Sequence, residues 1–318
     1  MKLPYTWGGA MLLALISGSL PASAGECWAP TRAAATSGTG EPLSAPKFMR
    51  LTAAMQQAEA MMREDPSLGA IAGLRFQANR SLTYIDSEQP AYTASVSVTL
   101  HEPNVWSGPG CGIRQGEADY FNKRAVEINF NQLTDIIGAA AAQGEPGEPM
   151  IVNLFPEAIE TYQRTGLINT VGEGVRAFRP DGGPVIVPLT VSEYLGMWEK
   201  RLNTFIAEGG GEFAAPQLKA LKAHRATLSP AQLEAQVWMD GSYSDQLWAY
   251  VAEKTELGAP VYQVAPDLLD GFADKTAVNL VTVKWYGPDD DEATKALEDW
   301  ARNFPVAKAN ALMTGAAR

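Results

Sequence analysis

The stretch "TAVNLVTVKWYGPDDDEATKALEDWARNF", Thr276 to Phe304, places both kinds of secondary structure next to each other. Residues 276–287 predict a late β-strand, and residues 289–304 predict a final helix. Along the rest of the chain, helical and strand patterns follow one another irregularly, without an internal repeat of fixed period. This mixture predicts an α+β fold, with mixed α/β as the alternative, in a compact globular secreted protein.

The clearest helix signal begins at Thr190, where the chain reads T-x-x-E and forms a capping box with Glu193. Apolar residues then recur with the i, i+3, i+4, i+7 spacing of one helix face as far as Ile206. The sequence "EGGGE", 208–212, predicts the end of this helix. A second helix start is predicted at Ser229, which a proline follows directly.

Several other segments carry secondary-structure signals. Periodic apolar residues predict a helix over 47–64, which stops before Pro66. Strands are expected over 91–101 and 124–130, a helix over 131–143, and a hairpin around the "PDGG" turn at 180–183.

Residues 1–24 have the order of elements that is typical of a secretory signal peptide. Lys2 provides the basic start, an unbroken apolar run follows, and Ala22-Ser23-Ala24 forms an A-x-A cleavage site. We therefore expect cleavage after Ala24 and export to the periplasm or the outside of a bacterial cell. No later segment is apolar and long enough to predict a membrane-spanning helix.

The rest of the chain divides by composition. One segment rich in small residues, glycine and proline predicts an extended arm, and a second one, "GEPGEP", predicts a linker or a prominent loop. The expected parts are an arm over 25–46, an N-terminal α+β region over 47–143, the linker or loop at 144–149 and a C-terminal α+β region over 150–318. The two regions form either two domains or one.

The two cysteines are Cys27 and Cys111. In an oxidising compartment we expect them to pair, because two cysteines allow a single intramolecular connectivity. Cys111 lies in "VWSGPGCGIR", 105–114, whose glycines suit a tight loop that lets the sulfur approach its partner. Lipidation of Cys27 is not expected, since Glu26 stands where lipoprotein signals need a small residue. The prediction is one structural disulfide.

One pair of segments could form the active site of a serine hydrolase. "SAPK", Ser44 to Lys47, matches S-x-x-K, and "DKTA", 274–277, resembles in part the K-T-G motif of penicillin-binding proteins and serine β-lactamases. That resemblance implies Ser44 as the nucleophile, Lys47 as the group that helps to activate it, and Lys275 beside the site. The chain departs from the family pattern at Ala277, where the family has glycine, and it has no S-D-N motif between the segments. The alternative is that Ser44 caps the helix that begins near Lys47.

Other motifs of catalysis and cofactor binding are missing from the sequence. It contains no G-x-S-x-G, G-x-x-x-x-G-K-[ST], G-x-G-x-x-G or H-E-x-x-H, so no cofactor and no metal are predicted. The acidic run "GPDDDEATK", 287–295, offers carboxylates to a calcium ion but lacks the alternating pattern of a calcium loop. The favoured interpretation is that these acidic residues interact with the dipole at the start of the final helix.

Aromatic residues gather in the sequence "VWMDGSYSDQLWAYV". Trp238, Tyr243 and Trp248 are candidate ligand-binding residues, because exposed aromatic rings can stack on sugars or dock a partner. The alternative is that they belong to the core, where aromatic residues beside apolar neighbours are common.

The charge balance limits the classes of partner. With 25 basic and 36 acidic residues, the net charge of −11 argues against nucleic acid and against an anionic membrane surface. Whether the protein is an enzyme is not decided by the sequence. The lack of a nucleophile, metal or cofactor motif favours non-catalytic binding of a small molecule, a saccharide or a protein partner. The alternative is a hydrolase acting on cell-envelope or extracellular polymers.

Overall fold

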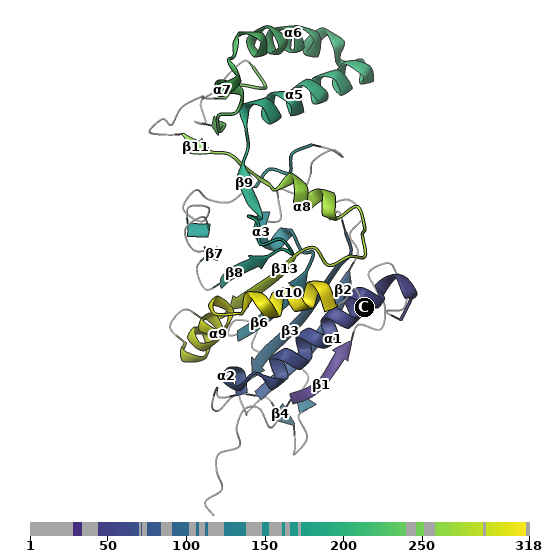
Figure 1. Cartoon of the computed structure of the whole chain (residues 1–318), viewed down its shortest axis with the longest axis vertical. Coiled ribbons are helices and arrows are strands. Elements are labelled where there is room, and N and C mark those ends of the chain that lie inside the picture. Colours follow the sequence, from purple (N-terminus) through teal and green to yellow (C-terminus); the bar gives the residue numbers. More distant parts are fainter. Residues whose placement is uncertain are drawn as a thin grey trace, which may run out of the picture.

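A sheet of seven strands, in the order β1-β2-β3-β6-β13-β8-β7, forms the centre of the protein (Figure 1). The computed structural model describes residues 28–33, 44–69, 71, 75–83, 91–101, 106–107, 112–113, 124–137, 148–152, 161–162, 166–170, 173–239, 246–250, 258–288 and 291–315. The strands are β1 (Trp28–Ala33), β2 (Arg75–Thr83), β3 (Thr93–His101), β6 (Arg124–Phe130), β7 (Leu167–Thr170), β8 (Glu173–Phe178) and β13 (Val281–Tyr286). Neighbouring strands are antiparallel except β1 and β2, which are parallel.

Helices cover one face of this sheet. They are α1 (Met49–Glu64), α9 (Glu292–Arg302) and α10 (Val306–Gly315), which lie together across the strands in Figure 1. The covered face carries alternate residues of each strand, such as Val126 and Ile128 of β6 and Val281 and Val283 of β13. Because side chains of a strand alternate between the two faces, the intervening residues, such as Thr282, point to the other face. Burial of these apolar rows against the helices drives the formation of this layer.

The strand predicted over 276–287 is β13, which is shorter than predicted and lies in the middle of the sheet between β6 and β8. The predicted final helix begins later than expected, at Glu292, because the Asp291 side chain caps it by accepting a hydrogen bond from the Thr294 amide at 2.8 Å. This helix, α9, is not the last one. The chain turns at Pro305 and continues as α10, which the sequence analysis does not predict.

A second core lies on the other face of β7 and β8, where Ile168 and Val175 contribute to it. It is completed by α3 (Thr134–Ile137), β9 (Ile186–Pro188), β12 (Tyr262–Val264) and α8 (Pro266–Gly271). The hairpin predicted around 180–183 is wrong. Both edges of β8 are already paired, one with β13 and one with β7, so β9 pairs with β12 instead.

The capping box predicted at Thr190 is confirmed. The Glu193 amide donates to Thr190 Oγ1 at 3.2 Å, and the Thr190 amide donates to Glu193 Oε2 at 2.9 Å, at the start of α5 (Val191–Phe205). The predicted end of this helix at 208–212 is confirmed. α5 ends at Phe205, and the chain turns through a short segment, η5 (Ile206–Gly210), before α6 (Gly211–Thr227) begins. Gly209 allows this turn, because its φ of 100° lies in a region that residues with a Cβ atom rarely adopt.

The helices α5 and α6 form a hairpin that projects from the sheet (Figure 1). A third core fills the hairpin and includes Leu195, Leu202, Leu221 and Trp248. The hairpin is followed by α7 (Pro230–Leu233), which begins at the predicted cap, Ser229. The protein therefore has three packed regions, of which only the first contains the helix-covered face of the sheet.

The remaining predictions concern shorter segments. The helix expected over 47–64 and the strands expected over 91–101 and 124–130 are confirmed as α1, β3 and β6. Part of the expected arm, 25–46, forms the edge strand β1. Other short elements are η2 (Pro46–Phe48), α2 (Pro66–Gly69), β4 (Trp106–Ser107), β5 (Gly112–Ile113), β10 (Trp238–Met239) and β11 (Ala259–Pro260). The predicted combination of helices and strands in an α+β fold is confirmed, and the central sheet is largely antiparallel.

The two regions on either side of the "GEPGEP" segment share the central sheet. β6 precedes residues 144–149 and β13 follows them, and the two strands pair along their whole length. Within the described part of the chain, no helix combines the length and the apolar character that crossing a membrane requires.

Candidate functional site

A cleft of about 450 Å³ lies where α1 passes into α2 and α9 passes into α10. Its polar lining comes from the ends of these helices and consists of Asp65, Ser67, Asp299, Asn303 and Lys308. The helices meet there because all of them pack on the same face of the sheet. The cleft falls within the size range of pockets that hold small molecules.

The Asp65 carboxylate is held by three donors at one side of this cleft. It accepts hydrogen bonds from the Ser67 amide at 3.0 Å and from Lys308 Nζ at 3.2 Å, and Trp300 donates a third from its side chain. Burial by itself would raise the pKa of Asp65, but the hydrogen bonds from Trp300, Ser67 and Lys308 outweigh it and lower that pKa. Asp65 is therefore ionised at neutral pH and fixed in orientation.

The floor of the cleft is apolar. Trp300 and Phe304 belong to the core beneath, with ring centroids 5.2 Å apart, and Pro305 adds the turn between α9 and α10. Asn303 is held beside them, because its side-chain amide donates to the carbonyl oxygen of Asp299 at 2.8 Å. The cleft thus combines apolar side chains at its base with a rim of hydrogen-bonding groups.

Sequence reasoning did not find this cleft. Asp65 and Lys308 are far apart in the chain, and their proximity depends on the packing of α1 against α10. The local signal near Asp65 was a helix stop before a proline, which indicates a boundary rather than a site. The sequence also gave no indication of α10, so Lys308 had no predicted position.

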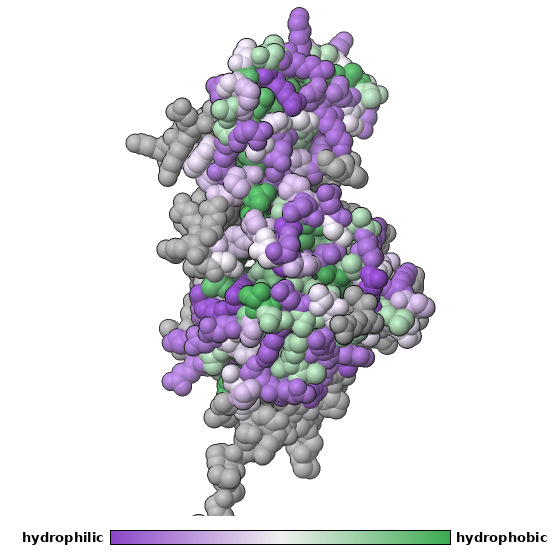
Figure 2. Space-filling view, in the orientation of Figure 1, coloured by the Kyte–Doolittle hydropathy of each residue, from purple (hydrophilic) through white to green (hydrophobic). Residues whose placement is uncertain are grey.

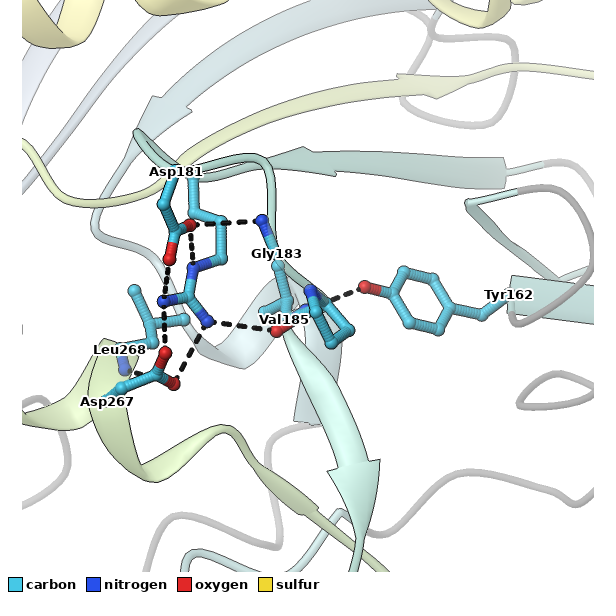
Figure 3. A network of polar contacts seen from close by, with 8 residues as sticks. Tyr162, Asp181, Gly183, Val185, Asp267 and Leu268 are labelled. Atoms are coloured by element: carbon cyan, nitrogen blue, oxygen red, sulfur yellow. Dashed lines mark hydrogen bonds and ion pairs between the residues drawn. The ribbon is translucent and has the colours of Figure 1, made fainter.

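A second polar network, shown in Figure 3, connects the β8–β9 turn to α8. The buried Arg179 side chain binds Asp181 at 2.7 Å and Asp267 at 2.7 Å and 3.1 Å, while its Nη1 also donates to the Pro184 carbonyl at 3.1 Å. The hydrogen bond from Arg179 is the main cause of the lowered pKa of Asp267. The donors and acceptors of this network pair with one another, so we interpret the network as a structural link between the β8–β9 turn and α8.

The face of the sheet opposite α1, α9 and α10 carries a third polar group. Tyr286 donates a hydrogen bond from its hydroxyl to Glu127 at 3.1 Å, and Lys284 lies 3.4 Å from Glu173. These side chains are cross-strand neighbours on β6, β13 and β8. Burial, followed by the charge of Glu127, raises the pKa of Tyr286, so this tyrosine stays protonated and donates to the carboxylate.

The structure brings the S-x-x-K segment and the "DKTA" segment to the same part of the molecule. The Tyr92 amide donates to the Lys275 carbonyl at 3.0 Å, and Lys47 Nζ lies 5.7 Å from the Tyr92 ring centroid. Arg50, in the first turn of α1 just after the S-x-x-K segment, forms an ion pair with Asp274 at 2.8 Å. Ser44 is exposed, and neither η2 nor α1 receives a side-chain cap, so the proposed capping role of Ser44 is wrong.

The aromatic candidates occupy different environments. Trp248 is buried, and its ring stacks on His224 with centroids 5.3 Å apart. Trp238 is half-buried on β10, and Tyr243 lies outside the described residues. Tyr250, in the same aromatic stretch, hydrogen-bonds to His224 Nε2 at 3.0 Å. Trp248 and Tyr250 belong to the hairpin core, as the alternative interpretation expects.

Within the described part of the acidic run, the Asp291 carboxylate is occupied by protein partners. Arg124 donates to both carboxylate oxygens of Asp291, from Nε at 2.6 Å and from Nη2 at 2.8 Å. Asp291 also caps α9, as the sequence interpretation of a helix start requires. Among the described residues, no cluster of three or more histidine, cysteine, aspartate or glutamate side chains could hold a metal ion. Cys27 and Cys111, and with them the predicted disulfide, lie outside the described residues.

Comparison of the chain with protein-family models, with curated proteins and with solved structures finds no match. The site must therefore be interpreted from its own chemistry.

Proposed function

We propose that this protein is an exported, non-catalytic binding protein, and that the cleft at the ends of α1, α9 and α10 is its ligand site. The observation that carries the proposal is the Asp65 carboxylate, fixed by three donors beside an apolar floor. Clefts with a largely apolar lining and a few oriented polar groups are the usual form of small-molecule sites.

The chemistry of the rim supports a saccharide as the ligand. Asp65 and Asp299 offer acceptors for hydroxyl groups, and Lys308 offers a donor. A sugar ring presents hydroxyl groups around its edge and C–H groups on its face, which the apolar floor at Trp300 and Pro305 can contact. Hydrogen bonds to charged groups are stronger than those between neutral groups, so a neutral polyhydroxylated ligand gains from this rim.

The test uses the purified protein and a panel of saccharides, including cell-wall fragments, with inorganic phosphate and a simple amine for comparison. A saccharide at about 100 times its dissociation constant stabilises the fold by about 2.7 kcal/mol, which is visible as a rise in melting temperature. Ala296→Phe places a ring in the cleft and should abolish the rise. Ala307→Phe is the control, because Ala307 is exposed on α10 but does not line the cleft.

The proposal fails if no saccharide raises the melting temperature, or if Ala296→Phe and the control respond alike. Turnover of a stabilising saccharide would support the alternative, a hydrolase of envelope or extracellular polymers. Export is tested separately, by expressing the full precursor in bacteria and measuring the mass of the recovered protein. The expected N-terminal residue is Gly25, and an intact N-terminus would contradict export through cleavage after Ala24.

A further inference from the structure

One face of α9 supplies much of the lining of the cleft. Ala296, Asp299, Trp300 and Asn303 all line it, and they follow the i, i+3, i+4, i+7 spacing of a single helix face. Side chains four residues apart are neighbours on a helix, so Asp299 and Asn303 lie next to each other, beside the Trp300 ring. Figure 2 shows hydrophilic and apolar residues side by side over α9 and α10.

The cleft lining carries one net negative charge, at Asp299. The charged residues of the lining are Asp65, Asp299 and Lys308. Asp65 and Lys308 form an ion pair at 3.2 Å and neutralise each other. Within the described part of the chain, the exposed Asp299 carboxylate makes no hydrogen bond and no ion pair, not even with Lys295 one turn earlier on α9. This carboxylate is therefore available to a cationic ligand.

The helix ends at the cleft do not offset this charge. α1 and α9 end there, and α2 and α10 begin there. The carboxyl end of a helix favours a cation and the amino end favours an anion, so the two kinds of helix end oppose each other. The side chains therefore decide which charge the cleft attracts, and Asp299 favours a cation.

The hydrogen-bonding groups beside Asp299 add further acceptors. Asn303 Nδ2 donates to the Asp299 carbonyl oxygen at 2.8 Å, which leaves Asn303 Oδ1 as an acceptor for a ligand. The two carboxylate oxygens of Asp299 are acceptors as well. An ammonium group has three N–H donors and no acceptor, so it matches these adjacent oxygens better than a hydroxyl group, which has one donor. Hydrogen bonds between ionised groups are also the stronger ones.

We propose that the ligand of the cleft is a sugar with a free, protonated amino group, and that this group binds between Asp299 and Asn303. The inference rests on the saccharide proposal above and narrows it to one class of sugar. The sugar ring lies against Trp300 and Pro305, and hydroxyl groups at its other edge contact Lys308. A positive charge beside the Trp300 ring adds a cation–π interaction.

The expected preference is modest, because Asp299 is exposed. Glucosamine should bind roughly threefold to fivefold more tightly than glucose, which has a hydroxyl group in place of the amino group. Glucuronate should bind more weakly than glucose, because its carboxylate meets the charge of Asp299 while Lys308 is already paired with Asp65. The preference for glucosamine should shrink as salt is raised. It should also disappear well above pH 8, where an amino group with a pKa in the α-amino range of about 7.7–8.0 is neutral.

The test is isothermal titration calorimetry of the purified protein with glucosamine, glucose and glucuronate. Asp299→Asn keeps the size of the side chain and removes its charge, so it should bring the ratio of the glucosamine and glucose affinities close to one. Asp270→Asn is the matched control, because Asp270 is exposed on α8 and does not line the cleft. It removes the same charge elsewhere and should leave the ratio unchanged. Circular dichroism verifies that both variants are folded.

The outcomes separate this inference from the saccharide proposal. Equal binding of glucosamine and glucose, both blocked by Ala296→Phe, would overturn the amino-sugar inference and leave the saccharide site standing. Tighter binding of glucuronate, or a preference for glucosamine that Asp299→Asn leaves unchanged, would overturn the inference as well. Methylamine that bound as tightly as glucosamine would show that the cleft recognises the charge without the sugar ring. If none of the three sugars binds, the inference fails, and the wider saccharide panel decides whether the cleft binds any sugar.

Discussion

Replacing Asp291 should reveal how the central sheet is joined to its helix layer. Its carboxylate accepts hydrogen bonds from Arg124 of β6, at 2.6 Å and 2.8 Å, and from the amide of Thr294 in α9, at 2.8 Å. The side chains of Arg124 and Asp291 are only 14% and 21% exposed. One residue therefore serves as the N-cap of a helix and as the partner of a partly buried cation on the sheet.

The magnitude follows from these two roles. Loss of an N-cap costs about 1 kcal/mol, and loss of a hydrogen-bonded charge pair costs about 1.5–3 kcal/mol. Asp291→Ala removes both and should lower the free energy of unfolding by about 2–4 kcal/mol. Asp291→Asn keeps a good cap and should lower it by about 1–2 kcal/mol. Asp299→Ala, an exposed carboxylate on the same helix, should change it by less than about 0.5 kcal/mol.

The pH dependence has a definite sign. The hydrogen bond from Arg124 is the main cause of the lowered pKa of Asp291, so the folded state favours the ionised form. Its contribution to stability is present above the ordinary aspartate pKa of about 3.9 and disappears as the pH falls through the lower, folded value. The difference between the wild type and Asp291→Ala should therefore be large at neutral pH and shrink towards the N-cap contribution of the neutral acid below that value.

Urea unfolding at neutral and acidic pH measures both effects. The reasoning is refuted if Asp291→Ala costs less than about 0.5 kcal/mol at neutral pH, or if its cost does not change with pH. Addition of calcium should leave the melting temperature of the wild type unchanged, because protein donors already occupy the Asp291 carboxylate. A rise in melting temperature in the presence of calcium would instead support calcium binding by the acidic run.

Three further predictions concern other residues. Burial raises the pKa of Asp135, although hydrogen bonds from Thr282 and Asn129 act in the opposite direction, so the stability that this residue provides at low pH is lost as the pH rises through its folded pKa. Asp135→Asn should therefore be at least as stable as the wild type at neutral pH, and its free energy of unfolding in urea should depend less on pH. A loss of stability that is equal at every pH would contradict this. Asn131, at a φ of 57°, makes four hydrogen bonds from its side chain to backbone groups of two segments, one at Tyr92 and one at 277–280. Asn131→Ala should therefore lower the free energy of unfolding by about 3 kcal/mol or more, with Asn131→Gly about 1 kcal/mol milder. Equal losses would show that the backbone conformation does not matter. Cys27 and Cys111 should resist alkylation until reductant is added. Replacing either cysteine should lower the free energy of unfolding by about 2–4 kcal/mol, with no further loss when both are replaced. Two thiols that react without reductant would rule the disulfide out.

The elements that the sequence predicted best are those determined by interactions between residues close together in the chain. α5 begins where the Thr190 capping box places it, because that interaction involves only the first turn of the helix. β3 and β6 were found because alternating burial leaves a trace in the sequence. The end of α5 was also found, because a run of glycines allows the chain to leave the helical conformation, as Gly209 does with a φ of 100°.

Pairing between strands required information that no single segment contains. The "PDGG" turn has the composition of a hairpin, and Gly182 does adopt a φ of 70° there. The partner of β9 is nevertheless β12, since both edges of β8 are taken by strands distant in sequence. The cleft could not be predicted for the same reason, because Asp65 and Lys308 come into contact only when α1 and α10 pack together.

The register of the sheet also bears on the predicted disulfide. Trp28 at the start of β1 pairs with Phe76, and Phe76 pairs with Leu100 near the end of β3. Cys27 directly precedes β1, and the chain that leaves β3 leads to Cys111. Both segments therefore depart from the same end of the sheet, which makes the pairing topologically reasonable and gives the alkylation experiment a physical basis.

The cleft and the hairpin turn depend on different cores, so the effects of substitutions in the two regions can be separated. Trp300 and Phe304 beneath the cleft belong to the core of the helix-covered sheet, whereas Leu202 and Leu221 near the hairpin turn belong to the third core. Substitutions in separate regions without shared partners usually have additive effects. Phe213→Ser in the hairpin should therefore leave saccharide binding intact, whereas Ala296→Phe in the cleft should abolish it. Loss of saccharide binding in a folded Phe213→Ser variant would show that the hairpin and the sheet are coupled.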